Sequence, residues 1–277
     1  MNYKILEGFL DEDFCKKLIE DANNYSRNDH ISVLNNRLIL PSSSLAFINL
    51  LSKSSTWQKL HDKLNSQSFL DNLLDELNLN TQNFSVTNYF FNSNPNIFQK
   101  KYKQLNSKTI STIGNMNLLF YGFYKFYRYL KRKLKYSFSK YNYVELLYDF
   151  SKSPNGYKRE IHRDSDSRTI VFLIYLNELN GDGEGGDLNL HQYKNTNLLI
   201  PAQPNEQDCY LIKNIPPKTG RLITFINSED SLHSVSEMRN YNEFRYFIYG
   251  SFTLLGKKNS FLKNSKNILK TNFNIFE

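Results

Sequence analysis

The feature that most constrains this chain is the triplet His162-Arg163-Asp164, together with a further histidine, His233, far downstream. In an extended strand, residues i and i+2 point to the same side, so His162 and Asp164 can present their side chains together. Two imidazoles and one carboxylate on one side of a metal leave the opposite positions open, which suits Fe(II) that must also bind a co-substrate and O2. Because His233 has to reach the same ion from another strand, the pattern requires a fold that brings distant strands together, such as a β-barrel.

A His-x-Asp triplet alone is more often a hydrogen-bonded surface pair than a metal site, so its surroundings decide how it is interpreted. Runs of β-branched and aromatic residues flank the triplet, and loops rich in Gly, Pro, Asn and Ser separate them. These predicted strands are residues 144–150, 169–176, 222–226 and 244–252. The second half of the chain is therefore predicted to form an antiparallel β core.

These motifs, in this order, resemble the 2-oxoglutarate and Fe(II)-dependent oxygenases, in their prolyl 4-hydroxylase-like branch. The matching elements are the His-x-Asp triplet, the block IYLNE…EGGDL (174–188), the segment PPKTGRLITF (216–225), the distal His233, and an arginine on the following strand. A leading segment, ILEGFLDEDFC, also looks like the one that such proteins carry before their first helix. The resemblance implies a double-stranded β-helix (a jelly-roll, cupin-like core) flanked by N-terminal α-helices.

The resemblance also implies roles for individual residues. His162, Asp164 and His233 would be the iron ligands. Arg245 would bind the far carboxylate of 2-oxoglutarate, because a guanidinium pairs with a carboxylate through two parallel hydrogen bonds; Arg239 competes for this role but lies in a predicted loop. Tyr148 would donate its hydroxyl to the same carboxylate, although it lies further before the triplet than the family pattern has it.

A second tyrosine, Tyr157, lies between Tyr148 and the triplet, so the tyrosine that contacts 2-oxoglutarate is left open. The implied cofactors are Fe(II), 2-oxoglutarate as co-substrate and O2, with ascorbate as a candidate reductant. The implied reaction hydroxylates an unactivated C–H bond and converts 2-oxoglutarate to succinate and CO2. The carboxylate ligand Asp164 favours hydroxylation, since related halogenases lack it.

The substrate is not identified by the sequence: a peptide, an amino acid, a glycan or a lipid-linked acceptor is compatible with the site. Two alternatives stay open. One is a non-catalytic jelly-roll binding protein. The other is a nucleic-acid-directed oxygenase that uses the basic, aromatic segment 123–141; this segment is more simply interpreted as a solvated amphipathic helix, so nucleic acid is not the favoured partner.

The N-terminal half is predicted to be mostly helical. Asp11 can cap a first helix that runs to about Tyr25, and further short helices are predicted at 45–51, 57–64 and 69–77. We expect a helical elaboration over 1–140, the jelly-roll oxygenase core over 141–256 and a tail over 257–277.

Composition limits the remaining classes. Among 277 residues with a formal net charge of +8 there is no apolar run long enough to span a membrane and no signal-peptide pattern. The two cysteines do not make a disulfide framework, and Cys15 is predicted to be a small core residue. A cytoplasmic location is the expectation.

Overall fold

The fold is known from a computed structural model that describes residues 1–25, 32–34, 37–42, 44–79, 84–86, 142–195 and 199–254. Two compact units are distinguished: Met1–Leu79 with Leu146–Thr253, and Asn80–Glu145 with Leu254–Glu277. Most of the second unit lies outside the described residues, including the basic segment 123–141 and the predicted tail 257–277. The predicted domain boundaries therefore stay predictions.

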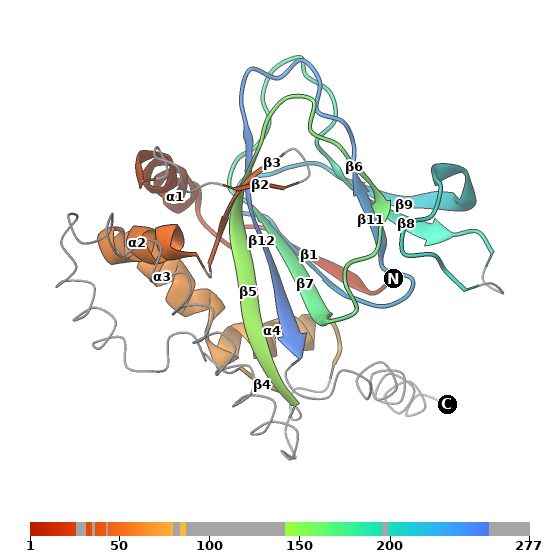
Figure 1. Ribbon diagram of the computed structural model, residues 1–277, viewed down its shortest axis with the longest axis horizontal. Coiled ribbons are helices and arrows are strands. Elements are labelled where there is room, and N and C mark those ends of the chain that lie inside the picture. The colour runs from red at the N-terminus through yellow and green to blue at the C-terminus, as the bar shows by residue number, and fades with distance from the viewer. Residues whose placement is uncertain are drawn as a thin grey trace, which may run out of the picture. The chain divides into compact units, whose positions relative to one another are not determined.

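Eight strands form the core, and their pairing is that of a jelly roll (Figure 1). Strands that are equally far along the chain from the connection between β8 and β9 lie next to each other, so that one pair is nested within the next. β8 pairs with β9, β7 with β10, β6 with β11, and β5 lies beside β12. This nesting confirms the predicted double-stranded β-helix. The strands are β5 (Asn142–Ser153), β6 (Arg159–His162), β7 (Arg168–Tyr175), β8 (Leu188–Tyr193), β9 (Cys209–Ile215), β10 (Leu222–Ile226), β11 (Leu232–Val235) and β12 (Arg245–Leu254).

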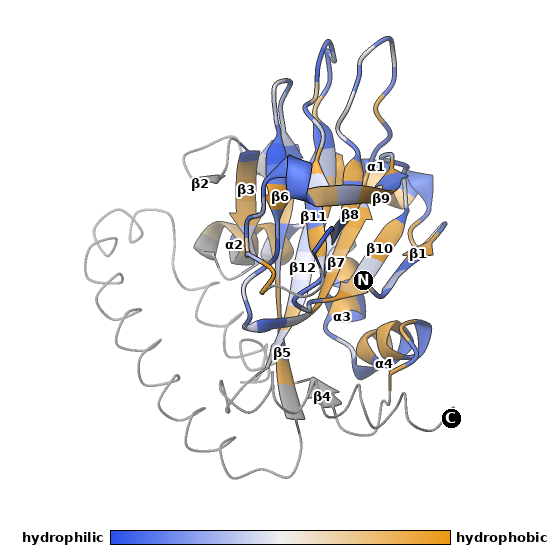
Figure 2. Ribbon diagram, turned by 90° about the vertical axis from the view of Figure 1, so that its right-hand side faces the viewer, coloured by the Kyte–Doolittle hydropathy of each residue, from blue (hydrophilic) through white to orange (hydrophobic). Residues whose placement is uncertain are grey.

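The two sheets face each other, with β10, β7, β12 and β5 in the larger sheet and β6, β11, β8 and β9 in the smaller (Figure 1). The central strand β7 is buried from Thr169 to Tyr175, because both of its faces are covered. Strands β7 and β10 are accordingly hydrophobic along most of their length (Figure 2). Alternation along β7 sends Val171, Leu173 and Tyr175 between the sheets, while Ile170, Phe172 and Ile174 point outward.

Strands from the N-terminal part widen the larger sheet. β1 (Tyr3–Leu6) pairs with β10, and β3 (Arg37–Pro41) pairs with β5 on one side and with β2 (Ser32–Leu34) on the other. In the second unit, β4 (Phe84–Val86) pairs in parallel with the start of β5. None of the three pairings that β1 and β3 make was predicted.

Four α-helices of the described residues cover the outer face of the larger sheet (Figure 1). Edge-to-face aromatic pairs join the two layers: Trp57 with Phe150 at 5.5 Å and Phe69 with Phe172 at 5.3 Å between ring centroids. The predicted helices are confirmed, and none of them is long and apolar enough to cross a membrane. They are α1 (Glu12–Tyr25), α2 (Leu45–Lys53), α3 (Ser55–Leu64) and α4 (Gln67–Glu76).

A side chain caps the first helix as the sequence predicts. The carboxylate of Asp11 accepts a hydrogen bond from the backbone N–H of Phe14 at 2.7 Å, at the start of α1. Cys15, on the same helix, is fully buried, and both cysteines are free thiols. Its predicted role as a small core residue is confirmed.

At two positions of the sequence motifs, Gly185 and Gly220, steric constraints explain why the residue is glycine. Gly185, in the EGGDL block, has a φ of +81°, and a Cβ there would lie 1.9 Å from the carbonyl oxygen of Glu237. Gly220, in the PPKTG segment, has a φ of +73°, and a Cβ would lie 2.0 Å from the carbonyl oxygen of Leu10. Only glycine tolerates both the backbone conformation and the close approach. The first contact fixes the loop before β8, and the second fixes the N-terminal segment against the core.

Candidate metal centre

The three predicted metal ligands come together at one end of the smaller sheet. His162 ends β6 and pairs in register with His233 on β11, so the two imidazole rings lie side by side with their centroids 4.4 Å apart. Asp164 follows β6 by two residues. One ligand atom from each of the three side chains lies within 4.8 Å of the other two. The pairing of β6 with β11 thus brings His233 next to His162, as the sequence pattern requires.

Backbone carbonyls orient both imidazoles. Nδ1 of His162 lies 2.8 Å from the carbonyl oxygen of Glu160, and Nδ1 of His233 lies 3.0 Å from that of Ser231. A carbonyl only accepts hydrogen bonds, so Nδ1 carries the proton in each ring and Nε2 keeps its lone pair. Histidine ligands of metals are oriented in this way, by a hydrogen bond from the ring nitrogen that does not bind the metal.

Asp164 offers one oxygen to the same place. Its Oδ1 accepts a hydrogen bond from Nη1 of Arg168 at 2.7 Å, while its Oδ2 is buried without a hydrogen-bond partner and lies 3.7 Å from Nε2 of His233. Arg168 also donates to the hydroxyl of Tyr249, so two side chains position this carboxylate. A buried carboxylate oxygen without a partner is costly, and a cation would satisfy it.

The protonation states suit a divalent cation. Burial, reinforced by neighbouring His233, lowers the pKa of His162 to about 4, so its imidazole is neutral at pH 7. Burial alone would raise the pKa of Asp164, but His233 and Arg168 outweigh it and the pKa is lowered. A neutral imidazole and a charged carboxylate are the forms that bind a metal. The residues present therefore fit an iron of the kind that the sequence motifs imply.

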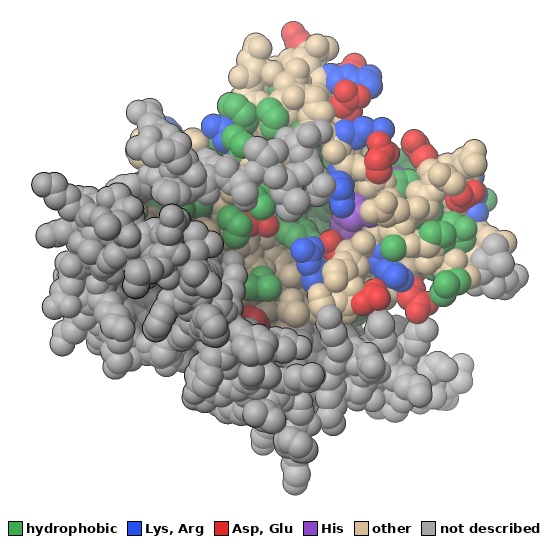
Figure 3. Space-filling model, in the orientation of Figure 1, with side chains coloured by type: hydrophobic (Ala, Val, Ile, Leu, Met, Phe, Trp, Pro, Cys, Tyr) green, Lys and Arg blue, Asp and Glu red, His purple; other side chains and the backbone are tan. Residues whose placement is uncertain are grey.

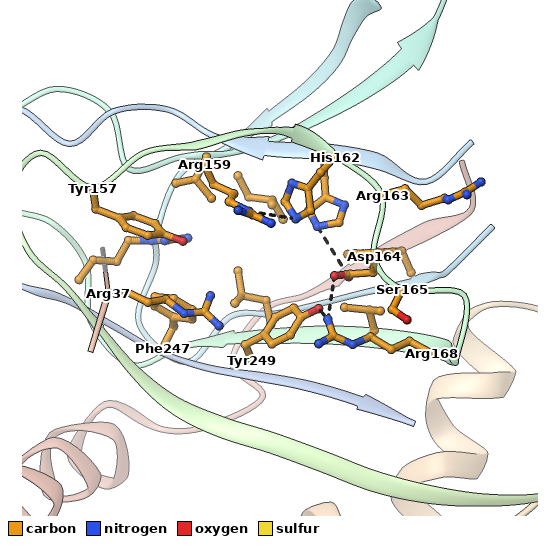
Figure 4. A pocket seen from close by; sticks show the side chains of 17 residues that line it. Arg37, Tyr157, Arg159, His162, Arg163, Asp164, Ser165, Arg168, Phe247 and Tyr249 are labelled. Atoms are coloured by element: carbon orange, nitrogen blue, oxygen red, sulfur yellow. Dashed lines mark hydrogen bonds and ion pairs between the residues drawn. The ribbon is translucent and has the colours of Figure 1, made fainter. Parts of the chain in front are cut away.

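A pocket between the two sheets opens onto these three residues (Figure 4). Among the described residues, its lining comprises six apolar side chains and five arginines but only one carboxylate, that of Asp164. The apolar residues are Val171, Leu173, Leu188, Phe225, Val235 and Phe247, and the arginines are Arg37, Arg159, Arg163, Arg168 and Arg245.

Arg245 lies in this pocket as a buried cation with unused donors. Its guanidinium lies 4.5 Å from the ring centroid of Phe247, and its Nη2 donates to the hydroxyl of Tyr175 at 3.1 Å. Its Nε and Nη1 are buried and have no hydrogen-bond partner. Such a group can bind a carboxylate through two hydrogen bonds. Its rival Arg239, in contrast, is exposed and pairs with Glu237 at 2.5 Å.

Tyr148 is not in the pocket, and this corrects the prediction that it contacts 2-oxoglutarate. Its hydroxyl forms a hydrogen bond with Nδ1 of His61 on α3 at 2.6 Å, and its ring packs edge-to-face on Phe47. Alternation along β5 places Tyr148 on the helix-covered face and its neighbour Asp149 on the inner face. The alternative, Tyr157, does line the pocket.

Sequence reasoning missed Tyr175, Arg168 and Arg37. Tyr175 could have been found, because it follows Val171 and Leu173 at intervals of two on the inner face of a strand that the sequence predicts correctly. Arg168 lies four residues after Asp164, a spacing that carries no signal outside a helix. Arg37 belongs to no motif.

The comparisons agree with this geometry. Residues 148–252 match the family model of the 2OG-Fe(II) oxygenase superfamily, which confirms the predicted resemblance to that superfamily. No curated protein matches the chain in sequence.

Solved structures are similar at low sequence identity. A prolyl-4-hydroxylase of Pseudomonas putida is 13% identical with a TM-score of 0.45, and the match covers 91% of this chain and 92% of that one. The viral collagen prolyl hydroxylase of Paramecium Bursaria Chlorella virus-1 is 12% identical with a TM-score of 0.44, covering 93% and 97%. The non-heme alpha-ketoglutarate-dependent epimerase SnoN of nogalamycin biosynthesis is 9% identical with a TM-score of 0.49, covering 94% and 84%.

Proposed function

We propose that this chain, whose residues 148–252 match the 2OG-Fe(II) oxygenase superfamily, is a 2-oxoglutarate- and Fe(II)-dependent dioxygenase that hydroxylates an unactivated C–H bond. The observation that carries the proposal is the placement of a buried guanidinium, that of Arg245, whose Nε and Nη1 have no hydrogen-bond partner, in the same pocket as the convergent ligand atoms of His162, Asp164 and His233. A metal site alone would fit many functions. The added carboxylate-binding group supports a keto-diacid co-substrate.

His162, Asp164 and His233 would hold the iron from one side, through Nε2 of each histidine and Oδ2 of the aspartate. When bound, the iron supplies the oxidative chemistry, which couples decarboxylation of 2-oxoglutarate to succinate and CO2 with hydroxylation of the substrate. Arg168 keeps the carboxylate of Asp164 turned toward this site through its 2.7 Å hydrogen bond. The protein thereby holds the three side chains that would bind the iron at the edge of the pocket.

Arg245 would bind the carboxylate of 2-oxoglutarate that is remote from the iron. The Tyr175 hydroxyl and the Phe247 ring hold the guanidinium in place, so little conformational entropy is lost when the co-substrate binds. Ascorbate as the reductant and a cytoplasmic location stay predictions.

The substrate is proposed only as a class. A peptide, an amino acid, a glycan and a lipid-linked acceptor were all compatible with the sequence, and prolyl hydroxylases are among the similar structures. A non-catalytic jelly-roll binding protein is the alternative that the experiment must separate.

The test is succinate formation from 2-oxoglutarate by the full chain, reconstituted anaerobically with Fe(II) and then exposed to O2. We expect slow turnover without added substrate, which disappears in His162→Ala and Asp164→Ala. Binding of iron and of 2-oxoglutarate is measured in parallel by equilibrium dialysis. Failure of the wild-type chain to bind both would overturn the proposal and favour the non-catalytic protein.

A further inference from the structure

Three of the five arginines that line the pocket are not used by the proposed reaction. Arg245 is assigned to 2-oxoglutarate and Arg168 to the positioning of Asp164, which leaves Arg37, Arg159 and Arg163. Clustered cations repel one another, and placing them in a partly buried pocket costs free energy unless anions offset the charge. The co-substrate accounts for one carboxylate at Arg245, so the other arginines need a separate explanation.

Arg37 is held over the pocket with part of its hydrogen-bonding capacity unused. Its guanidinium lies 5.4 Å from the ring centroids of both Phe247 and Tyr249, and its side chain is 13% exposed. Its Nε is buried without a partner, and its contact with the carboxylate of Asp149 is long, at 3.6 Å. Burial alone would lower the pKa of Arg37, but Asp149 and the Tyr157 hydroxyl outweigh it, so the guanidinium stays charged.

Arg159 lies on the opposite wall, beside a metal ligand. Its Nε donates to Nε2 of His162 at 3.4 Å, the same lone pair that the iron would take. Metal binding therefore displaces Arg159 from this contact. Across the described ranges of the chain, no carboxylate lies within ion-pairing distance of Arg159, so a displaced Arg159 has its donors available.

Arg163 behaves differently. It forms an ion pair with Asp166 at 3.4 Å and points away from the centre of the pocket (Figure 4). Tyr157, which is buried, enters the same opening as Arg37 from the wall that carries Arg159 (Figure 4). In the space-filling view, Lys or Arg side chains lie on both sides of a histidine that is visible in a hollow (Figure 3). The candidate anion site thus consists of Arg37, Arg159 and Tyr157.

We propose that Arg37 and Arg159, with the hydroxyl of Tyr157, bind a carboxylate or phosphate group of the substrate that is hydroxylated. This inference rests on the proposed function, because it assigns the remainder of the same pocket. It narrows the substrate to an acidic compound or acidic side chain, and it makes these three residues determinants of specificity. Guanidinium groups suit both kinds of anion, since each offers two oxygens to the planar donor fork.

The experiment uses the full chain loaded with Mn(II) and saturated with 2-oxoglutarate. Mn(II) accepts carboxylate and nitrogen ligands and is paramagnetic, so it enhances the nuclear relaxation of a probe that binds close to it. The probes are inorganic phosphate, followed by ³¹P relaxation, and acetate with its neutral counterpart acetamide, which lacks a carboxylate, followed by ¹³C relaxation. The variants are Arg37→Gln, Arg37→Lys and Arg159→Gln. Arg239→Gln is the matched control, because it removes the same charge from an exposed arginine outside the pocket.

We expect saturable relaxation enhancement of phosphate, of acetate or of both, and none of acetamide. Loss of a charge-assisted contact should raise the probe's dissociation constant about tenfold or more in Arg37→Gln and Arg159→Gln. Arg37→Lys should retain part of the affinity, and Arg239→Gln should retain all of it. Binding of phosphate alone identifies a phosphate-bearing substrate, and binding of acetate alone identifies a carboxylate-bearing one.

The inference is overturned if neither anion binds, if both glutamine variants bind as tightly as the wild type, or if Arg239→Gln weakens binding equally. Binding that survives in both variants would mean that the probe coordinates Mn(II) directly. The 2-oxoglutarate affinity of each variant is measured first, and we expect it to stay within about threefold of wild type. Loss of Mn(II) or 2-oxoglutarate binding by the wild type would instead refute the proposed function, and the inference would fall with it.

Discussion

The two faces of the larger sheet differ in whether their buried polar groups have hydrogen-bond partners, although the same strands form both faces. On the outer face and in the helices that cover it, buried polar atoms are paired: the Tyr148 hydroxyl bonds to His61 on α3, and the indole N–H of Trp57 on α3 donates to the carbonyl of Leu18 on α1 at 3.0 Å. On the inner face, Arg245 and Arg37 have buried N–H groups without partners. A protein keeps such groups where a ligand will satisfy them.

The difference separates stability from function within one strand layer. Changes to the outer face should alter the free energy of unfolding and leave ligand binding alone, because its polar and aromatic groups already satisfy one another. Changes to the inner face should weaken ligand binding and leave the free energy of unfolding nearly unchanged, because its polar groups are proposed to bind metal, co-substrate and substrate.

Arg245→Gln should have the largest effect. It leaves a buried carboxylate of 2-oxoglutarate without its cation, a loss of about 2–5 kcal/mol in comparable sites, so the dissociation constant should rise about a hundredfold. Calorimetric titration of the Mn(II)-loaded chain measures it. Arg37→Gln is the matched control, since both guanidiniums lie near the Phe247 ring. An equal loss of 2-oxoglutarate affinity in the two variants would show that the co-substrate and the substrate are not bound by different arginines of the pocket.

Arg168→Ala should weaken the metal site without removing a ligand. The hydrogen bond from Arg168 fixes Asp164, and losing such support typically lowers metal affinity about 10- to 100-fold. Competition against a chelator measures the Mn(II) affinity. Arg163→Ala serves as the control, because Arg163 adjoins Asp164 in sequence but pairs with Asp166. If Arg163→Ala costs as much, then net charge rather than ligand positioning governs affinity.

The convergence of His162, Asp164 and His233 could be predicted from the sequence, because this combination of side chains is rare and because each residue lies next to a predicted strand. His162 and Asp164 sit at i and i+2 after a recognisable strand, and His233 follows another. The jelly-roll core was predictable for the same reason. The strand β9 was not, since only its end residues Cys209 and Ile215 are buried and no alternation marks the residues between them.

Tyr148 and Arg37 show what sequence leaves undetermined. Along β5, side chains that can be buried occur on both faces of the strand. The sequence therefore does not show that Tyr148 faces the helices and that Asp149 faces the space between the sheets. Arg37 reaches the pocket only because β3 pairs with β5, a strand more than a hundred residues away, with Leu38 opposite Lys152. Long-range pairing of a short N-terminal strand has no local signature.

His61 on the outer face should make stability sensitive to acid. Burial lowers its pKa to about 4, whereas in the unfolded chain it is about 6.5. Between these values the unfolded state binds more protons, so stability present at neutral pH is lost as the pH falls from about 6.5 toward 4. By pH 5 the loss from His61 should be about 2 kcal/mol at 1.36 kcal/mol per pKa unit.

Urea unfolding of the metal-free chain at pH 7.5 and pH 5 measures this effect. His61→Gln should lose about 2 kcal/mol less than wild type over that interval, with unchanged 2-oxoglutarate affinity at pH 7.5. His162 contributes acid sensitivity of its own, because its pKa is also about 4, so the wild type and His61→Gln are both measured without metal. An identical pH dependence would mean that His61 is not held neutral by its burial.

Tyr148→Phe should have the smallest effect and tests the division between the faces most directly. The change removes one hydrogen bond to His61 and keeps the ring, so the free energy of unfolding should fall by about 1 kcal/mol. The loss is modest because Nδ2 of Asn65 lies 3.1 Å from Nδ1 of His61 and can still donate to it. The 2-oxoglutarate dissociation constant should not change, whereas Tyr175→Phe, which removes a hydroxyl from the inner face, should raise it several-fold because Arg245 loses its support. If Tyr148→Phe weakened 2-oxoglutarate binding as much as Tyr175→Phe, the two faces would not be functionally separate, and Tyr148 would regain the role that the sequence motif gave it.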